Sequence, residues 1–300
     1  MVFFSMKRID GWIEKSTRSL EGKTVAVSGA TGGLGRELCK ILLSLGADLI
    51  LLDRNKQRSL SLINELKMKY PKGRAVHITV DLEDIDAVRD AASELESKEP
   101  DYLILNAGAY SIPRHKCSTG FDNVFQINFV SPYLLARKLL PAIEKKGGRV
   151  VVVGSIAHNY SRTDPRDLDF STRSAASKVY GNAKRYLMFS LTDNASVSVT
   201  HPGIAVTGIT GHYPKLIYAL IKYPMKLIFM SPRKACLSII AGLFEDEGGH
   251  NQWIGPSIFN VWGFPKRQRL ETCKSDELLQ IRRTAEDIFD KLNKKQSSDD

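Results

Sequence analysis

Short runs of aliphatic residues alternate with amphipathic stretches from residue 24 to residue 201. The runs predict buried strands at residues 24–28, 48–53, 75–80, 102–105 and 148–153. Apolar residues then recur at helical spacing over residues 36–45, namely at Leu38, Ile41, Leu42 and Leu45. Strands that alternate with helices are typical of an α/β fold, so we expect one doubly wound parallel sheet with helices on both faces.

The chain has 300 residues, of which 43% are hydrophobic, and is long enough to bury one large core. No repeat or linker divides it, so we predict a single domain over residues 21–270. An amphipathic extension over residues 1–20 precedes this domain. Residues 271–300 should form a helix and a polar tail, with disorder expected from residue 290 onward.

A glycine-rich segment follows the first predicted strand: Gly29-Ala30-Thr31-Gly32-Gly33-Leu34-Gly35. Backbone N–H groups at the start of the next helix can hold a pyrophosphate, and a Cβ in the turn would block the approach of the phosphate. The next strand ends in Asp53, where a carboxylate that binds a ribose is expected. The segment predicts a dinucleotide site in a Rossmann-type fold, with spacing Gly-x-x-x-Gly-x-Gly in place of Gly-x-Gly-x-x-Gly.

Tyr180 and Lys184 are spaced i and i+4, which stacks both side chains on one face of a helix. The positive charge of the lysine would favour the phenolate and lower the pKa of the tyrosine from its ordinary value of about 10. Such a phenol can donate and accept a proton near neutral pH. Lys178 offers a competing register, but it would place Ser174 where the phenol is required.

In this order the segments resemble the short-chain dehydrogenase/reductase family over residues 24–207. The resemblance implies a catalytic set of four residues: Asn128, Ser155, Tyr180 and Lys184. It also implies that a nicotinamide dinucleotide, NAD or NADP, contacts Ser28, Gly29, Thr31, Gly32, Gly33, Leu34, Gly35, Asp53, Arg54, Asp81, Leu82, Asn106, Ala107, Gly108, Tyr180, Lys184, Pro202, Gly203 and Thr207.

The resemblance further implies that the protein interconverts an alcohol and a carbonyl compound by hydride transfer. Tyr180 would move the proton, Lys184 would hold the nicotinamide ribose, Ser155 would orient the substrate oxygen and Asn128 would support a water-linked proton path. Residues 155–158 and the long stretch before Tyr180 resemble the retinol-dehydrogenase-like branch. The alternative is a non-catalytic nicotinamide-binding sensor or scaffold protein at a membrane surface, because a fold can persist without turnover.

Two adjacent residues favour different cofactors. The carboxylate of Asp53 would accept hydrogen bonds from the ribose hydroxyls and repel a 2′-phosphate, whereas Arg54 could attract that phosphate. We favour NAD over NADP because of the carboxylate.

An apolar segment at about residues 208–232 follows Pro202 and Gly203. The resemblance implies that it forms the substrate lid, and its composition suits a lipophilic alcohol, ketone or aldehyde. Two alternatives stay open: a helix pair that only packs on the domain, and an amphipathic lid that rests with the N-terminal extension on an anionic membrane surface. Charged residues and a proline interrupt the segment, so we do not expect it to span a bilayer.

Composition and charge limit the classes of partner and the cellular location that we expect. The net charge of +10 is spread along the chain without a nucleic-acid motif, so we predict no nucleic-acid partner. Four cysteines lie far apart and no histidine has a partner at ligand spacing, so we predict reduced thiols and no metal. Charges interrupt the N-terminus before a signal-peptide core could form, which favours a cytoplasmic protein with peripheral membrane contact as an addition. A homo-oligomer is left open.

Overall fold

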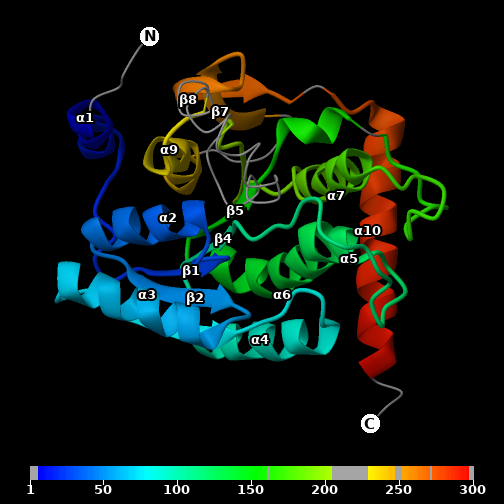
Figure 1. Cartoon of the computed structure of the whole chain (residues 1–300), viewed down its shortest axis with the longest axis horizontal. Coiled ribbons are helices and arrows are strands. Elements are labelled where there is room, and N and C mark those ends of the chain that lie inside the picture. The colour runs from blue at the N-terminus through cyan, green and yellow to red at the C-terminus, as the bar shows by residue number, and fades with distance from the viewer. Residues whose placement is uncertain (1–5, 161, 205–228, 247–251, 271, 297–300) are drawn as a thin grey trace, which may run out of the picture.

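The computed structural model describes residues 6–160, 162–204, 229–246, 252–270 and 272–296 (Figure 1). Its strands are β1 (Thr24–Ser28), β2 (Asp48–Asp53), β3 (Ala75–Thr79), β4 (Tyr102–Leu105), β5 (Arg149–Val153), β6 (Val197–Thr200), β7 (Gln252–Ile258) and β8 (Trp262–Arg269). Its α-helices are α1 (Met6–Ser16), α2 (Gly33–Ser44), α3 (Lys56–Lys69), α4 (Ile85–Ser97), α5 (Asn123–Phe125), α6 (Ser131–Lys145), α7 (Ala176–Ser190), α9 (Pro232–Leu243) and α10 (Ser275–Gln296). Two further turns are a π-helix, η1 (Gln126–Val130), and a 3₁₀-helix, η2 (Ile156–Asn159).

The eight strands of the described chain form one sheet in the order β3-β2-β1-β4-β5-β6-β7-β8. β1 pairs in parallel with both β2 and β4, so the chain winds from β1 to one edge and then from β4 to the other. This confirms the predicted doubly wound α/β sheet. Beyond the alternating strands and helices of residues 24–201, one edge strand departs from parallel pairing, since β8 runs antiparallel to β7. A tight turn at Phe259 and Asn260, both with positive φ, joins these two strands without a crossover helix.

Both faces of the sheet are buried, because successive side chains of a strand point to opposite sides. In β1, Val25 and Val27 belong to the core beneath α1, α2, α3 and α9, while Ala26 belongs to the core that α4, α6, α7 and α10 cover. Burial on both faces explains why the strands read as continuous apolar runs.

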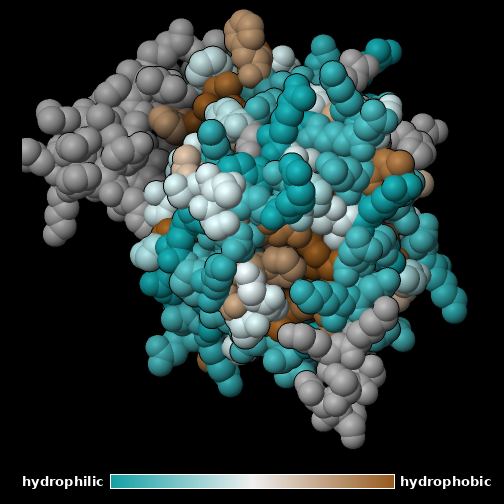
Figure 2. All heavy atoms as spheres, turned by 90° about the vertical axis from the view of Figure 1, so that its right-hand side faces the viewer, coloured by the Kyte–Doolittle hydropathy of each residue, from teal (hydrophilic) through white to brown (hydrophobic). Residues whose placement is uncertain are grey.

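Helices at the two ends of the chain pack on this framework. Ile9 and Ile13 of α1 are buried in the same core as α9. In α10, a buried stripe recurs at helical spacing: Ile281, Ala285, Ile288 and Leu292. The disorder expected from residue 290 is wrong as far as Gln296, because this stripe holds the last turns against the core. α10 runs along one side of the molecule, and that side is mostly hydrophilic on its outer surface (Figures 1 and 2).

None of the helices in the described part of the chain combines the length and the hydropathy that a bilayer crossing requires.

An aromatic cluster around Phe125 joins distant parts of the chain. The ring centroid of Phe125 lies 5.2 Å from that of Phe129, 5.2 Å from that of Phe170 and 5.5 Å from that of Tyr186. Phe170 belongs to the long stretch before α7, and Tyr186 belongs to α7 itself. The cluster therefore fixes that stretch against the helix that carries Tyr180.

We expect Phe125→Ala to lower the free energy of unfolding by about 3–5 kcal/mol, because the fully buried side chain contacts three aromatic rings and its removal leaves a cavity. Urea denaturation followed by circular dichroism measures this change. Phe259→Ala is the matched control, since this ring is 85% exposed and its loss should change stability by no more than about 0.5 kcal/mol. Equal losses in the two variants would contradict the role of the cluster.

Candidate active site

Polar contacts join the carboxyl ends of β1 and β4, where the strand order reverses. Ser28 Oγ donates to Ile104 O at 3.3 Å and accepts from the amides of Asn106 and Ala107, each at 3.0 Å. Asn106 Nδ2 donates to the carbonyl oxygens of Ser28 at 2.9 Å and of Gly29 at 3.2 Å. The crevice at such a reversal is where open α/β sheets bind their ligands, and these bonds hold its floor.

The glycine turn lies directly above this floor. A Cβ at Gly29, where φ is +67°, would lie 2.9 Å from Ala107 Cα, and one at Gly35 would lie 2.1 Å from Gly29 O. α2 starts at Gly33, and its N-cap, Gly32, makes no side-chain capping bond. The first N–H groups of α2 can therefore bind an anion, so the turn fits a pyrophosphate. The remaining predicted residues of the turn are half-buried: Thr31 and Leu34.

Asp53 lies at the end of β2 with 8% of its surface exposed. Oδ1 accepts from Thr31 Oγ1 at 2.8 Å and Thr31 N at 3.3 Å, and Oδ2 accepts from Ser59 Oγ at 3.2 Å. Burial raises the pKa of this carboxyl, although the three hydrogen bonds oppose the change. Its neighbour Arg54 is exposed. Asp53 therefore also braces the glycine turn, a role that the sequence pattern did not reveal.

Asp81 and Leu82 follow β3, the next strand toward the sheet edge. Asp81 Oδ1 accepts from Glu83 N at 3.0 Å. Leu82 is buried, and its carbonyl oxygen accepts from Ser131 Oγ of α6 at 2.7 Å. Both residues thus lie at the carboxyl edge of the sheet, as Asp53 does.

The π-helix η1 carries the fully buried Asn128. Asn128 Nδ2 donates to Ala109 O at 2.8 Å, and Oδ1 accepts from Ala109 N at 3.3 Å. A Cβ at Gly108 would lie 2.7 Å from Asn128 Oδ1 and 3.5 Å from Lys184 Nζ. Gly108 thus forms an exposed floor between two predicted catalytic side chains, with no room for a larger residue.

Ser155, Tyr180 and Lys184 meet where η2 lies against α7. Ser155 lies beside Tyr180, and hydrogen bonding by its side chain favours the ionised form of the phenol and so lowers its pKa. Lys184 Nζ donates to Val153 O at 3.0 Å and lies 5.8 Å from the centroid of the Tyr180 ring. The ring of Tyr110 packs edge-on against that of Tyr180, with centroids 5.3 Å apart. Tyr110 was not among the predicted site residues, and its only signal in the sequence is its place two residues after Gly108.

The two titratable side chains have shifted pKa values. Burial raises the pKa of Tyr180 to about 12, although the hydrogen bond with Ser155 acts in the opposite direction. Burial also lowers the pKa of Lys184 to about 8. The expected lowering of the tyrosine pKa is therefore wrong in this structure, because both charged forms lose water and this loss outweighs their attraction. Tyr180 is consequently a phenol that keeps its proton at neutral pH.

Pro202 and Gly203 follow β6 and carry the chain toward the predicted lid. Gly203 has a φ of +76°, and a Cβ there would lie 2.5 Å from a side-chain atom of Met230. Met230 is buried beside the start of α9. Thr207 and the lid over residues 208–228 lie outside the described residues. In the described ranges, no group of three or more metal-ligating side chains occurs.

A family model for short chain dehydrogenases matches residues 23–212, which is more than half of the chain. The chain belongs to the short-chain dehydrogenase family. It is an oxidoreductase that uses a nicotinamide cofactor for the interconversion of alcohols and carbonyl compounds. The uncapped start of α2 and the glycines at positions 29, 35 and 108 fit such a cofactor.

Curated relatives refine this assignment. Retinol dehydrogenase 14 from Mus musculus is 32% identical over 285 residues, which cover 87% of this chain and 80% of the relative. Polyprenol dehydrogenase from Mus musculus is 26% identical over 252 residues, which cover 78% of this chain and 75% of the relative. The short-chain dehydrogenase described here lies in the retinol-dehydrogenase-like branch.

Solved structures share the fold at lower identity. An uncharacterized protein from Mycobacterium paratuberculosis has a TM-score of 0.72 at 21% identity, over 92% of this chain and 96% of that chain. L-sorbose reductase from Gluconobacter frateurii, complexed with NADPH and L-sorbose, has a TM-score of 0.56 at 20% identity, over 76% and 92% of the two chains.

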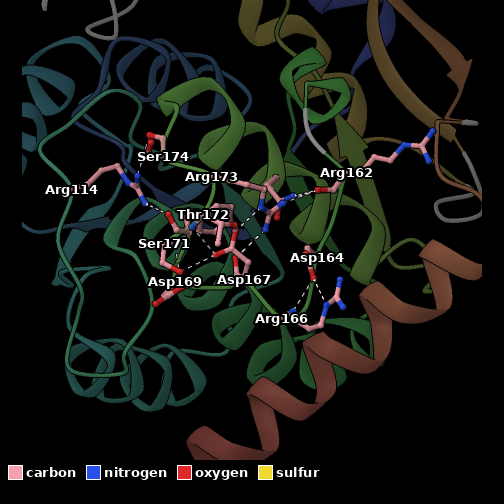
Figure 3. Close-up of polar contacts among 12 residues, drawn as sticks. Arg114, Arg162, Asp164, Arg166, Asp167, Asp169, Ser171, Thr172, Arg173 and Ser174 are labelled. Atoms are coloured by element: carbon pink, nitrogen blue, oxygen red, sulfur yellow. Dashed lines mark hydrogen bonds and ion pairs between the residues drawn. The ribbon is translucent and has the colours of Figure 1, made fainter.

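The long stretch between Ser155 and Tyr180 is ordered by two arginines (Figure 3). Asp167 accepts from Arg173 Nε at 2.8 Å and Thr172 Oγ1 at 2.6 Å. Arg114 donates to Asp122 Oδ2 at 2.7 Å, and its other nitrogens donate to the carbonyls of Phe170 and Ser174. Although burial opposes ionisation, the Arg173 and Thr172 bonds lower the pKa of Asp167. These bonds fix the stretch between residues 162 and 174 to the segment that carries Arg114.

We expect Gly108→Ala to raise the dissociation constant for the nicotinamide cofactor about tenfold, or ~1.4 kcal/mol, because the added methyl group displaces Asn128 and crowds Lys184. Fluorescence titration with NADH and NADPH measures the constant. Gly11→Ala in α1 is the control, since a Cβ there would meet no atom within 4 Å. Unchanged binding by Gly108→Ala would show that this floor does not touch the cofactor.

Proposed function

We propose that this short-chain dehydrogenase interconverts a lipophilic alcohol and its aldehyde or ketone, with Tyr180 as general acid and base. The observation that carries the proposal is the grouping of Ser155, Tyr180 and the buried Lys184, whose Nζ lies 5.8 Å from the centroid of the Tyr180 ring. A nicotinamide cofactor supplies or accepts the hydride when it is bound. The protein must then provide or remove one proton at the substrate oxygen.

Tyr180 is suited to donate that proton during reduction, because a phenol with a pKa of about 12 is protonated at neutral pH. Ser155 would hold the same substrate oxygen through its hydroxyl group. In the direction of oxidation Tyr180 must accept a proton as a phenolate, and the Ser155 hydrogen bond is the contact that lowers its pKa. Both directions therefore depend on where Ser155 lies.

Lys184 and Asn128 would support Tyr180 and Ser155 by binding the cofactor and by positioning the floor of its site. Lys184 would bind the hydroxyls of the nicotinamide ribose, since an ammonium has three hydrogens and Val153 O accepts one of them. Asn128 Nδ2 gives its hydrogens to Ala109 O and Val124 O, each at 2.8 Å. These bonds support a positioning role for Asn128 at the cofactor floor. The proton path expected through Asn128 stays a prediction.

Two observations support a lipophilic substrate. Relatives in the same branch are named for retinol and polyprenol. Three apolar or aromatic side chains close in sequence to Gly108 and Ser155 are only partly buried, namely Tyr110, Ile112 and Ile156, and Tyr110 packs directly against Tyr180. Membrane contact through the lid and the N-terminus stays a prediction, because residues 1–5 and 205–228 lie outside the described part of the chain.

We propose NAD as the preferred cofactor. The carboxylate of Asp53 lies at the end of β2. Its Oδ1 atom accepts two hydrogen bonds from Thr31, whereas Oδ2 retains a lone pair beyond the bond from Ser59. Its negative charge would repel a 2′-phosphate at this place.

We expect Tyr180→Phe to lower kcat at least about 100-fold and to leave the dissociation constant for the cofactor unchanged, because only the acid and base is lost. Absorbance of the reduced cofactor with retinal, long-chain aldehydes and ketones measures turnover. Tyr186→Phe is the matched control, since it removes the same atom from the buried side of the same helix. A near-native rate in Tyr180→Phe would refute the assignment.

We expect Asp53→Asn to raise the ratio of kcat/KM for NADP over NAD about tenfold, or ~1.4 kcal/mol, because the repulsive charge is removed while the hydrogen bond to Thr31 can remain. Steady-state kinetics with both cofactors measure the ratio. Asp48→Asn, at the start of the same strand and paired with Arg74, should leave the ratio unchanged. A wild-type preference for NADP would contradict the choice of cofactor.

A further inference from the structure

His158 connects the loop of the catalytic serine to the C-terminal segment. Its ring is fully buried, with Nδ1 2.6 Å from Ser155 O and Nε2 2.8 Å from Thr272 Oγ1. Ser155 and Thr272 are 117 positions apart in the chain, so the imidazole is a direct bridge between distant segments.

The partners of the ring determine its tautomer. A carbonyl oxygen can only accept, so Nδ1 must carry a hydrogen that it donates to Ser155 O. Burial lowers the pKa of His158, and the nearby charge of Arg185 adds to this effect. The imidazole is therefore neutral, and Nε2 accepts the hydroxyl hydrogen of Thr272.

An ion pair holds the same two segments from the other side. Arg185 directly follows Lys184 in α7, and only 4% of its side chain is exposed. Its guanidinium donates to both carboxylate oxygens of Glu277 at 2.7 Å, to Thr272 O at 2.6 Å and to His158 O at 3.3 Å. This bidentate pair fixes α10 to the catalytic helix and to the main chain of His158.

Glu277 accepts hydrogen bonds from Thr163 as well as from Arg185. Its Oε1 atom also accepts from Thr163 Oγ1 at 3.0 Å and Thr163 N at 3.2 Å. Although burial opposes ionisation, these bonds and Arg185 lower the pKa of Glu277 to about 2. The pair is therefore ionised throughout the neutral range.

We propose that His158, held by Thr272 and by the Arg185–Glu277 ion pair, is a positioning residue that fixes the catalytic Ser155. The proposal rests on the proposed function, in which Ser155 hydrogen-bonds Tyr180 and the substrate oxygen. Ser155 O accepts from His158 Nδ1 and also from His158 N at 3.1 Å, so the peptide after Ser155 cannot rotate freely. Because Ser155 Oγ moves with that peptide, the C-terminal segment controls the hydroxyl that faces Tyr180.

The charged and titratable groups around His158 come from three elements. Arg185 of α7 approaches its carbonyl oxygen, and Glu277 of α10 neutralises that arginine. The ring of Trp253 contacts both His158 and His201, with centroids 5.4 Å and 5.2 Å apart, and burial lowers the pKa of His201 to about 4. Both histidines are thus neutral under conditions of turnover, and Arg185 is the cation next to the bridge.

Replacing Thr272 with valine removes the hydroxyl group that donates to His158 Nε2 and leaves the shape of the side chain nearly unchanged. We expect Thr272→Val to lower kcat about tenfold without changing the dissociation constant for the cofactor, because a displaced Ser155 no longer supports proton transfer. In the direction of alcohol oxidation, the midpoint of the rise of kcat with pH should move upward, because the hydrogen bond that lowers the Tyr180 pKa is weakened. His158→Leu should show both effects more strongly, and His158→Asn, which keeps a donor for Ser155 O, should recover part of the rate.

Thr192→Val is the matched control. This buried threonine donates to Phe189 O at 3.2 Å and accepts from Arg282 at 3.4 Å, and its hydroxyl makes no hydrogen bond with His158, Ser155 or Thr272. It should lower the thermal midpoint as Thr272→Val does, yet leave kcat and its pH midpoint unchanged. A shift of the pH midpoint therefore separates positioning from a general loss of stability.

Side-chain ¹⁵N spectra provide a readout that is independent of turnover. The wild-type protein should show His158 as the neutral Nδ1–H tautomer, and an Nε2–H tautomer would overturn the proposal. Normal wild-type turnover with an unchanged kcat and pH midpoint in Thr272→Val would refute the positioning role alone. A wild-type protein that turns over no alcohol or carbonyl compound would refute the proposed function, and the positioning role with it.

Discussion

The polar join between β1 and β4 is the constraint on which the site depends. Parallel strands that diverge at a reversal of strand order would leave unpaired main-chain groups at the bottom of the crevice. Ser28 Oγ and the amide of Asn106 satisfy these groups and tie the two strand ends together. The glycine turn and Gly108 then approach from either side, so both walls of the crevice rest on one hydrogen-bonded floor.

The half of the site that holds Tyr180 depends on a close contact between the backbones of η2 and α7. A Cβ at Gly181 would lie only 2.2 Å from Ala157 O, so η2 and α7 touch next to Tyr180. Glycine inside a helix costs up to about 1 kcal/mol relative to alanine, and here it allows Ser155 to reach the phenol. Burial disfavours the charged form of each group, so the pKa of Tyr180 rises and that of Lys184 falls.

Local sequence patterns predicted the strands, the glycine turn and the i, i+4 pair of Tyr180 and Lys184, because each of these depends on residues that are close together in the chain. They could not predict the π-helix at Asn128, whose extra residue is stabilised by bonds to a loop 19 positions earlier. Nor could they predict the antiparallel β8 or the length of α10. The polar residues after position 290 suggest disorder when taken alone, and only the buried faces of Ile288 and Leu292 show why the helix continues.

The direction of the pKa shift of Tyr180 could not be predicted from the i, i+4 spacing alone. The i, i+4 spacing places an ammonium near the phenol, but the loss of water around both groups determines the sign of the shift. Hydrogen bonding by Ser155 is the contribution that lowers the pKa of the phenol, whereas burial and the neighbouring Tyr110 raise it. A base in the direction of oxidation therefore requires an accurately placed serine hydroxyl. The contacts of His158, Thr272 and the Arg185–Glu277 pair extend that requirement from α7 to the C-terminal helix.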